Sequence, residues 1–433
     1  MKAQALGQKI ADKTVQLATV GLGYVGLPLS VEFASAGIRV VGVDIDGSKV
    51  EAIRNGKSYV RDVPATAVSR LVEEGTLSAS SDFDVLADQD AVIICVPTPL
   101  SKTKDPDLSF VINASTEIAK RLRRGQLIVL ESTTYPGTTE ELILPKLEES
   151  GLEVGEGFFL AFSPERVDPG NAKWNTRNTP KILGAMTPNC LEVACALYSH
   201  AVDKVIPVSS TRTAEMVKLL ENTFRSVNIG LVNEVALMCD RLGVDVWEVI
   251  DAAATKPFGF MPFYPGPGLG GHCIPIDPFY LSWKLKTLNY RARFIELAGE
   301  INSAMPYYVV NKIQDALNER QRSVRGSRIL ILGMSYKKDN EDIRESPGLD
   351  IFRILQQKGA QVSYHDPLVA ELELDGRVYR SVELEDALSS TDCAVVVTEH
   401  SSFDMENIVT RAPLLIDTRN ATKHIRSDKV LKI

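Results

Sequence analysis

Short apolar runs alternate with amphipathic segments along the first third of the chain. Residues 15–20, 91–96 and 127–130 are apolar runs of strand length, and residues 38–44 form a further one. The first amphipathic segment, residues 27–35, spaces its apolar positions as a helix does and is followed by a glycine. Apolar strands separated by helices predict a parallel, doubly wound sheet.

A longer periodicity follows in the middle of the chain. Residues 211–242 contain no proline, and Gly230 is their only glycine. The residues that recur there at helical spacing are Met216, Leu219, Leu220, Thr223, Val227, Leu231, Val235 and Met238. This pattern predicts a single long helix that ends at Gly243. Such a helix can connect two α/β halves and form an oligomer interface, although the pattern is equally typical of a plain core helix.

The strand–helix alternation returns after residue 325. The run RILILGM is followed by a helical pattern at about residues 347–357 and by the strand pattern AQVSYHD. The two halves correspond in role, because FASAGIRVVGVD matches LQQKGAQVSYHD, QDAVIICVPTP matches TDCAVVVTEH, and LIVLEST matches PLLIDTR. We therefore predict an α/β protein with two Rossmann-like, doubly wound parallel-sheet domains, joined by a long central helix and a helical middle region. The expected limits are 1–208 for the first domain, 209–322 for the central region and 323–433 for the second domain.

Composition and charge narrow the class of partner. The formal net charge is −8, which argues against nucleic acid or an anionic membrane surface as the main partner. The six cysteines include no CxxC pair, as is usual for reduced thiols in the cytosol. We find no signal-peptide pattern and no apolar run of membrane-spanning length, so we expect a soluble cytoplasmic protein.

The first strand is followed by the motif GLGYVG. Gly21, Gly23 and Gly26 have G-x-G-x-x-G spacing between a predicted strand and a predicted helix. In such a turn the glycines allow a tight bend, a close approach of a pyrophosphate to the backbone, and close packing of helix on strand. Asp44 ends the second strand, where a carboxylate accepts both ribose hydroxyls and repels a 2′-phosphate. The context favours a site for NAD, rather than NADP, over a glycine-rich turn without a ligand.

Polar residues also follow later strands. Pro97-Thr98 and Ser132-Thr133 come at the edge where parallel sheets bind ligands. The second sheet has only Gly333 in its first turn, so it lacks a dinucleotide motif. That turn carries three basic side chains, which suit the oxygens of a diphosphate but equally fit a solvated run of charges. They are Lys337, Lys338 and Arg344.

The segment PGPGLGGHCIPIDP is the most informative stretch of the chain. Its four glycines form a loop that can wrap a ligand closely and that ends at His272-Cys273. Cys273 fits either a buried structural thiol or a nucleophile. No second Cys/His pair occurs at ligand spacing, so we expect no metal. Lys218 and Asn222, four residues apart on the long helix, can stabilise an oxyanion and so favour the nucleophile; without Cys273 they would indicate a solvated helix face.

These motifs together resemble one family along essentially the whole chain. They are, in order, VGLGYVGLPLS, VPTP, EST, FSPERVDPG, KLLENTFRSVNI, PGPGLGGHCIPIDP and GMSYKKDNEDIRES. The chain is similar to the UDP-glucose/GDP-mannose 6-dehydrogenase family. This resemblance implies a four-electron NAD-dependent dehydrogenase with an N-terminal NAD domain, a helical dimerisation region and a C-terminal UDP-binding domain. The implied partners are a UDP-sugar and further copies of the chain, as a homodimer or a higher homo-oligomer.

The resemblance also implies roles for the residues of the chemical centre. Cys273 matches the nucleophile that captures the C6 aldehyde as a thiohemiacetal, from which a second hydride transfer gives a thioester that water hydrolyses. Lys218 and Asn222 match the pair that stabilises the oxyanion, and Asp277 matches the carboxylate that orients water. Glu165 in SPER matches a proposed general base, and whether Glu165 or Asp277 is the main base stays open.

Cofactor and substrate contacts are implied in the same way. Thr133 matches a catalytic residue near the nicotinamide, Arg344 a cofactor-contacting arginine, and Lys337 a substrate-contacting lysine. The expected cofactor-binding residues are Gly21, Gly23, Tyr24, Val25, Gly26, Asp44, Lys49, Pro97, Thr98, Thr133 and Arg344. The expected substrate-binding residues are Glu165, Arg166, Val167, Lys218, Asn222, Gly270 and Lys337.

One departure from the family bears on the substrate. Members that act on UDP-glucose carry an arginine in the loop before the cysteine, but no arginine lies between Arg241 and Arg291 here. The loop reads TKPFGFMPFYPGPG, with Lys256 as the nearest cation. Together with FSPERVDPG and GGHCIPIDP, this loop resembles the branch that acts on UDP-N-acetylhexosamines. We expect UDP-N-acetylglucosamine as substrate, with UDP-glucose and UDP-N-acetylmannosamine as alternatives.

Two other classes of protein share part of this pattern. A two-electron hydroxyacid-type dehydrogenase would share the first sheet and the long helix, but it would not need Cys273 or a second nucleotide-binding domain. A non-catalytic nucleotide-sugar-binding protein would be expected to have lost Cys273, Lys218 and Asp277. The yield of NADH per sugar, which is two, one or none, separates the three classes.

Overall fold

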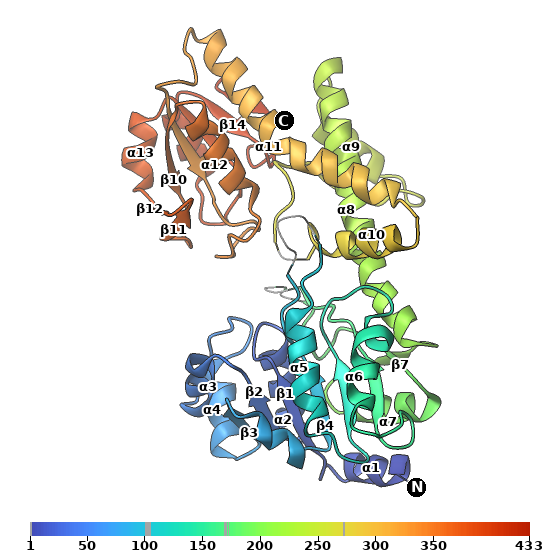
Figure 1. The fold of residues 1–433 in the computed structure, drawn as a ribbon. Coiled ribbons are helices and arrows are strands. Elements are labelled where there is room, and N and C mark those ends of the chain that lie inside the picture. Colours follow the sequence, from blue (N-terminus) through green and yellow to red (C-terminus); the bar gives the residue numbers. More distant parts are fainter. Residues whose placement is uncertain (1, 100–104, 169–170, 172, 272) are drawn as a thin grey trace. The chain divides into compact units, whose positions relative to one another are not determined.

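The computed structural model describes residues 2–99, 105–168, 171, 173–271 and 273–433 (Figure 1). His272 and the Pro169-Gly170 end of the FSPERVDPG motif lie outside the described residues. The chain forms two compact units, residues 1–221 with 283–289 and residues 222–282 with 290–433. The three regions expected from the sequence, with limits at 208/209 and 322/323, stay a prediction.

The first unit is built on an eight-stranded sheet in the order β3-β2-β1-β4-β5-β6-β7-β8. The strands are β1 Gln16–Val20, β2 Arg39–Val43, β3 Leu77–Ser80, β4 Ala91–Ile94, β5 Leu127–Leu130, β6 Phe159–Phe162, β7 Lys181–Ala185 and β8 Val205–Pro207. Strands β1 to β6 pair in parallel, which confirms the doubly wound sheet. Neighbouring residues of one strand enter different apolar clusters, as Ile93 and Ile94 of β4 do, so both faces are buried and the strands are unbroken apolar runs.

Strand β7, which was not predicted, departs from the parallel direction of β1 to β6. It pairs with β6 in antiparallel orientation, with Ala161 opposite Ala185 and Phe162 opposite Gly184. The described residues of the 163–180 connection contain no helix, and a parallel return would need such a crossover. β7 therefore starts at the edge of the sheet where β6 ends. This reversal brings Lys181, its first residue, to the edge that carries the predicted site.

The first unit has helices before its first strand and between its later strands. They are α1 Lys2–Ala11, α2 Gly26–Ser35, α3 Gly47–Arg54, α4 Ala65–Glu73, α5 Ser109–Ala119, α6 Leu144–Glu148 and α7 Pro188–Tyr198, with a 3₁₀ turn at Phe83–Asp88 and a π-helical turn at Thr139–Ile143. The predicted helix at residues 27–35 is α2, whose first residue is the last glycine of GLGYVG.

The second unit holds a five-stranded parallel sheet in the order β10-β9-β13-β14-β15. Its strands are β9 Arg328–Leu332, β10 Gln361–His365, β13 Cys393–Val396, β14 Leu415–Asp417 and β15 Val430–Lys432. The helices are α9 Val246–Ala254, α11 Arg293–Glu319, α12 Pro347–Gln357, α13 Leu384–Ser390 and α14 Met405–Arg411. An antiparallel hairpin, β11 Glu371–Leu374 and β12 Arg377–Arg380, completes it. The second Rossmann-like sheet is confirmed, whereas the hairpin was not predicted.

Two helices contain residues of both units. Helix α8 runs from Thr211 to Leu242 without interruption, which confirms the predicted long helix at both of its ends (Figure 1). Helix α10, Asp277–Thr287, begins four residues after Cys273. Among the described helices, none is both long and apolar enough to cross a membrane.

Candidate active site

The GLGYVG turn follows β1 with glycines that the backbone requires. Gly21 has φ of +93°, and a Cβ there would lie 2.5 Å from the Cys95 carbonyl oxygen. A Cβ at Gly26 would lie 1.8 Å from the Gly21 carbonyl oxygen. A Cβ at Gly23 would meet no protein atom within 4 Å, so protein packing does not explain this glycine. Gly23 is the position at which a pyrophosphate approaches the backbone of such a turn.

Asp44 lies beside this turn with its carboxylate partly engaged. Oδ2 accepts the Leu22 N–H at 2.8 Å, and Oδ1 accepts the Asp46 N–H at 2.9 Å. Lys49 Nζ lies 3.4 Å from Oδ2. An ionised carboxylate has about four acceptor positions, so Asp44 retains capacity for ribose hydroxyls.

The N-terminus of α2 and two strand ends complete the fit to a dinucleotide. No side chain caps α2 at Val25. Leu27 donates to the Gly23 carbonyl and Pro28 has no N–H, so an anionic group would be met by the positive end of the helix dipole and by only part of the first-turn amides. Tyr24 and Pro97 are exposed, and Thr98 is buried. Thr133 is half-buried after β5, next to Ser132, whose hydroxyl donates to the Val96 carbonyl at 2.7 Å. The residues present thus fit the predicted NAD.

The loop after Thr133 is held by a buried carboxylate of α8. Glu215 accepts the Gly137 N–H at 2.6 Å and the Thr139 N–H at 2.9 Å, and the Thr139 hydroxyl donates to it at 2.7 Å. Burial raises the pKa of Glu215 to about 7, although these hydrogen bonds lower it. Glu215 therefore fixes the start of the π-helical turn that follows the loop.

Glu165 lies after β6 with both carboxylate oxygens occupied. Oε1 accepts the N–H groups of Arg166 and Val167, each at 2.7 Å, and Oε2 lies 2.9 Å from Lys181 Nζ. Burial alone would raise the pKa of Glu165, but the Lys181 ammonium and these hydrogen bonds outweigh it and lower the pKa to about 2. Glu165 is therefore an anion at neutral pH.

Arg166 is turned into an ion pair with the long helix. Its Nε and one terminal nitrogen contact the two carboxylate oxygens of Glu221 at 3.2 and 2.6 Å. The other terminal nitrogen donates to the Pro180 carbonyl at 2.7 Å. The predicted substrate contact of Arg166 would have to compete with this bidentate pair.

In the second unit, Cys273 is followed by one turn that leads into α10. The Asp277 N–H donates to the Cys273 carbonyl at 2.8 Å. The Asp277 side chain is buried, and its carboxylate accepts a hydrogen bond from the side-chain amide of Asn222 on α8. The structure thus brings together three predicted residues of the chemical centre, Asn222, Asp277 and Cys273. Lys218, one helical turn before Asn222, is buried.

Cys273 differs from the other cysteines in its exposure. Cys273 is exposed, whereas Cys195 is half-buried and the remaining cysteines are buried. The buried ones are Cys95, Cys190, Cys239 and Cys393. Burial also raises the thiol pKa of Cys95 and Cys195, which keeps these thiols protonated. An exposed thiol suits a nucleophile better than it suits a structural core residue.

The glycines before Cys273 pack against the first turn of the second sheet. A Cβ at Gly270 would lie 2.5 Å from the Tyr336 Cβ, and one at Gly271 would lie 2.8 Å from the Tyr336 ring. The Gly271 N–H donates to the Arg344 carbonyl at 2.9 Å. Arg344 itself forms a bidentate pair with Asp342, whose shortest contact is 2.6 Å. The cysteine loop and the basic 334–346 turn are therefore one packed structure.

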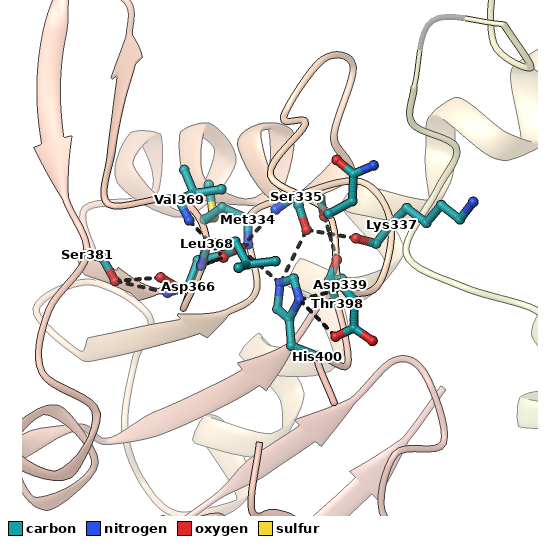
Figure 2. A network of polar contacts seen from close by, with 12 residues as sticks. Met334, Ser335, Lys337, Asp339, Asp366, Leu368, Val369, Ser381, Thr398 and His400 are labelled. Atoms are coloured by element: carbon teal, nitrogen blue, oxygen red, sulfur yellow. Dashed lines mark hydrogen bonds and ion pairs between the residues drawn. The ribbon is translucent and has the colours of Figure 1, made fainter. Parts of the chain in front are cut away.

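That turn is folded around a buried histidine (Figure 2). His400 Nε2 lies 3.1 Å from Asp366 Oδ2, and His400 Nδ1 accepts the Asp339 N–H at 3.1 Å. The Ser335 hydroxyl donates to the Lys337 carbonyl at 3.0 Å. Figure 2 shows the Lys337 side chain extending away from this network, as a ligand contact would require.

Domain models of the UDP-glucose/GDP-mannose dehydrogenase family match three parts of the chain. They are the NAD binding domain at residues 15–202, the central domain at residues 212–304 and the UDP binding domain at residues 330–424. The chain belongs to this family. It is therefore an NAD-dependent dehydrogenase with a UDP binding domain.

Relatives with similar length extend the match over nearly the whole chain. UDP-N-acetyl-D-glucosamine 6-dehydrogenase of Pseudomonas aeruginosa is 39% identical over 83% of this chain and 84% of its own. UDP-N-acetyl-D-mannosamine dehydrogenase of Methanococcus maripaludis is 36% identical over 94% of this chain and 93% of its own. A solved structure of the UDP-D-ManNAc dehydrogenase of Pyrococcus horikoshii matches with a TM-score of 0.89 at 34% identity, over 97% of this chain and 99% of its own.

Several residues of this family member's site were not predicted from the sequence. Glu131, Lys181 and Tyr198 form a buried polar cluster with Glu165, and Glu221 pairs with Arg166. A lysine that opens an apolar strand is an unusual placement, and it was the available signal for Lys181. Within the described residues, no cluster of three or more His, Cys, Asp or Glu side chains is arranged to hold a metal ion.

Proposed function

We propose that this dehydrogenase oxidises the C6 hydroxyl of a UDP-N-acetylhexosamine to the carboxylate, with UDP-N-acetylglucosamine as the preferred substrate. The observation that carries the proposal is the placement of the exposed Cys273 one turn before the buried Asp277, which is hydrogen-bonded to Asn222. A hydroxyacid-type dehydrogenase needs no such thiol. The arginine-free loop before Cys273 supports the N-acetylhexosamine over UDP-glucose.

In the proposed reaction, Cys273 acts first as the nucleophile and later as the leaving group. The GLGYVG turn and Asp44 would hold two NAD molecules in succession, and each supplies an acceptor for one hydride. Removal of the first hydride from C6 and of the hydroxyl proton leaves the C6 aldehyde. The Cys273 thiolate adds to the C6 aldehyde, forming a C–S bond, and the new oxygen takes a proton, which gives a thiohemiacetal. After loss of the second hydride and that proton, a thioester remains on Cys273. Water then attacks the thioester carbon, the C–S bond breaks, the Cys273 thiolate is regenerated and the sugar carboxylate is released. In total, one sugar and one water are converted to one carboxylate, two hydrides transferred to NAD, and three protons.

Lys218 and Asn222 suit the oxygen at which negative charge develops. They lie four residues apart on α8, which puts both side chains on one face of that helix. A cation and an amide donor placed in this way stabilise an alkoxide or oxyanion in a site that excludes water. We therefore assign them the stabilisation of the tetrahedral states on Cys273.

The carboxylates divide the hydrolytic step between them. Asp277 is buried and oriented by Asn222, so we assign it the positioning of the attacking water. Glu165 has a pKa lowered to about 2, which makes it a weak proton acceptor as it lies. We assign Glu165 a role in hydrolysis as a fixed negative charge, and Asp277 the acceptance of the proton.

A panel of UDP-sugars tests the substrate. Purified protein with NAD should release two NADH per UDP-N-acetylglucosamine, with kcat/KM at least about tenfold above that for UDP-glucose, or roughly 1.4 kcal/mol in transition-state binding. UDP-N-acetylmannosamine is the second candidate, because relatives named for it match at least as much of the chain. One NADH per sugar would contradict the four-electron reaction, and equal rates with UDP-glucose would contradict the assignment to N-acetylhexosamines.

Mass spectrometry of the intact protein tests the covalent step. With Glu165→Gln, which keeps the shape of the side chain but removes the charge, an adduct of the sugar-nucleotide acid should accumulate after a burst of about two NADH per site. Adding Cys273→Ala should abolish the adduct, whereas Cys195→Ala, at the half-buried thiol of α7, should not. An adduct that survives the loss of Cys273 would show that another residue is the nucleophile.

A second copy of the chain is the proposed partner. Phe224, Leu231 and Met238 recur every seven residues along α8 and are exposed by 48%, 54% and 49%. This spacing puts apolar side chains on one stripe, which two identical helices can pack against each other. Sedimentation of the wild type should show at least a dimer, and Leu231→Asp should shift it towards the monomer while the exposed Glu248→Asp should not. A monomeric wild type at micromolar concentration would contradict this interface.

A further inference from the structure

Three neighbouring strands of the first sheet bring charged side chains to one edge. Glu131 directly follows β5, and Glu165 follows β6 after two residues. Lys181 opens β7, which begins at this edge because it runs antiparallel to β6. The three residues are 50, 34 and 16 positions apart in pairs, so only the order and direction of the strands bring them together.

The lysine lies between the two carboxylates. Lys181 Nζ lies 2.9 Å from Glu165 Oε2 and also forms an ion pair with Glu131 Oε1. The Tyr198 hydroxyl, at the end of α7, donates to the other oxygen of Glu131. Side-chain exposure is 4% for Lys181, 0% for Glu131 and 15% for Glu165, so Glu165 is the member of the cluster most open to water.

The charges of the cluster do not cancel. Two carboxylates and one ammonium leave one negative charge when all three are ionised. Burial raises the pKa of Glu131 to about 7, even though Lys181 opposes this, whereas Glu165 remains ionised. Of the two carboxylates, Glu131 is therefore the one that protonates more readily. Buried ion pairs contribute little net stability, so the fold alone does not account for this arrangement.

We propose that Lys181 is a positioning residue for Glu165, and that Glu131, anchored by Tyr198, holds Lys181 in place. Lys181 then fixes the direction of the Glu165 carboxylate, because Oε1 is already tied to the backbone N–H groups of residues 166 and 167. The kinetic consequence rests on the proposed function, since it assumes that Glu165 assists hydrolysis of a thioester. The structural claim, that Lys181 keeps Glu165 ionised, does not.

The groups that face Glu165 define what the test must control. They are Lys181 and Glu131, with the Tyr198 hydroxyl and the buried Cys95 thiol behind them. Arg166 is engaged by Glu221. Removing Lys181 therefore leaves no other cation among these groups, and burial should then favour the protonated form of Glu165.

Nuclear magnetic resonance of protein labelled with ¹³C at the glutamate side-chain carboxyl carbon measures the ionisation of Glu165 and Glu131 directly. Glu165→Gln and Glu131→Gln assign the two signals by their loss. In the wild type, the Glu165 signal should stay at its ionised position to the lowest pH at which the protein is folded, and the Glu131 signal should titrate near pH 7. In Lys181→Met, the Glu165 signal should titrate above pH 5, and in Lys181→Arg it should stay ionised.

Two further variants keep the test decisive. Lys120→Met removes the exposed ammonium that pairs with Glu117, and it should leave both signals unchanged. Should Lys181→Met fail to fold, the double variant Glu131→Gln, Lys181→Met restores the buried net charge to one negative and should still raise the Glu165 midpoint above pH 5. A Glu165 signal that stays ionised without Lys181 overturns the proposal.

Kinetics separates this proposal from the proposed function. With UDP-N-acetylglucosamine, Lys181→Met should lower kcat by about tenfold or more below pH 6, should leave KM within about twofold, and should accumulate the acyl-enzyme, whereas Lys181→Arg should restore most of kcat. A wild type that makes no NADH with any UDP-sugar would refute the proposed function. The carboxyl titration would then still test whether Lys181 keeps Glu165 ionised. A Lys181→Met enzyme that deacylates normally at every pH would overturn the positioning role.

Discussion

The two sheets of this dehydrogenase share one turn geometry and use it differently. Gly21 after β1 and Gly333 after β9 have φ of +93° and +82°. A Cβ at either would lie within 2.5 Å of a carbonyl oxygen on the adjacent strand end, that of Cys95 or of Thr398. In both sheets the next backbone N–H donates to the aspartate after the second strand.

The two turns diverge after their first glycine. Helix α2 begins at Gly26, so its N-terminus lies at the end of β1, whereas α12 begins only at Pro347. In the second sheet the longer 334–346 turn fills the intervening space and is closed by His400 (Figure 2). A short turn exposes helix amides to a pyrophosphate, and a long one uses its amides internally.

The two aspartates show the same contrast. Asp44 accepts two described backbone N–H groups, whereas Asp366 accepts four, from residues 334, 335, 368 and 369, and also contacts His400. Asp366 is thus fully used by its own domain. An acidic residue after the second strand therefore indicates a ribose site only where its carboxylate is not already saturated by hydrogen bonds from the turn.

The largest expected effect is a difference in protein stability between variants of the two aspartates. Asp366→Ala leaves three buried N–H groups and one partly buried N–H group without an acceptor. It should lower the free energy of unfolding by about 3–5 kcal/mol, against about 1–2 kcal/mol for Asp44→Ala. Urea unfolding followed by circular dichroism at pH 7 measures both. Equal losses would mean that the two carboxylates do the same structural work.

Cofactor binding should reverse that ranking. Asp44→Ala should weaken NAD binding by about tenfold, or roughly 1.4 kcal/mol, and narrow the gap to NADP. Asp366→Asn should leave the dissociation constant of NAD unchanged. Isothermal titration with each cofactor gives the numbers, and a wild type that binds NAD and NADP equally well would contradict the role of Asp44.

Acid should weaken the second aspartate's contribution. Burial alone would raise the pKa of Asp366, but its hydrogen bonds from His400 and the backbone hold it below the usual 3.8. Because the folded pKa is the lower one, this stability is complete above about pH 4–5 and is lost as pH falls through the folded value. Urea midpoints of the wild type and Asp366→Asn should converge between pH 6 and pH 3. A constant gap would show that the charge is irrelevant.

The smallest expected effect concerns the closure of the long turn. His400→Gln loses the acceptor of the Asp339 N–H and should cost about 1 kcal/mol, with faster amide exchange confined to residues 334–346. His424→Gln, at an exposed histidine of the same domain, should stay within about 0.5 kcal/mol of the wild type. Unchanged amide exchange in residues 334–346 would show that His400 does not stabilise this turn.

The sequence predicted the features that depend on local pattern. The apolar period and Gly243 predicted both ends of α8, and the alternation of strands and helices predicted both sheets. The hairpin was missed although Asp375-Gly376, both with positive φ, is a strong turn signal between its strands. Strand β7 and its antiparallel direction were not predicted, because the 163–180 connection carries no crossover-helix pattern that would have indicated how the chain returns to the sheet.

Side-chain networks were predicted less well than backbone elements. Asn222, Asp277 and Cys273 could be grouped through their motifs, and the structure brings them together. The contact of Lys181 with Glu131 and Glu165 depends on the reversed strand, so no motif contains it. The saturation of Asp366 depends on the path of a turn and on a histidine 34 residues away, which apolar periodicity does not report.

The exposure of the cysteines predicts that this enzyme can be labelled selectively at one sulfur atom. With Cys273 exposed and the others buried or half-buried, an alkylating reagent should react first at Cys273. A probe could therefore be attached there without removing any native cysteine, and the rate of labelling would report occupancy of the proposed sugar site. The same exposure makes the protein open to peroxide, which would convert this sulfur to a sulfenic acid that a small thiol can reverse.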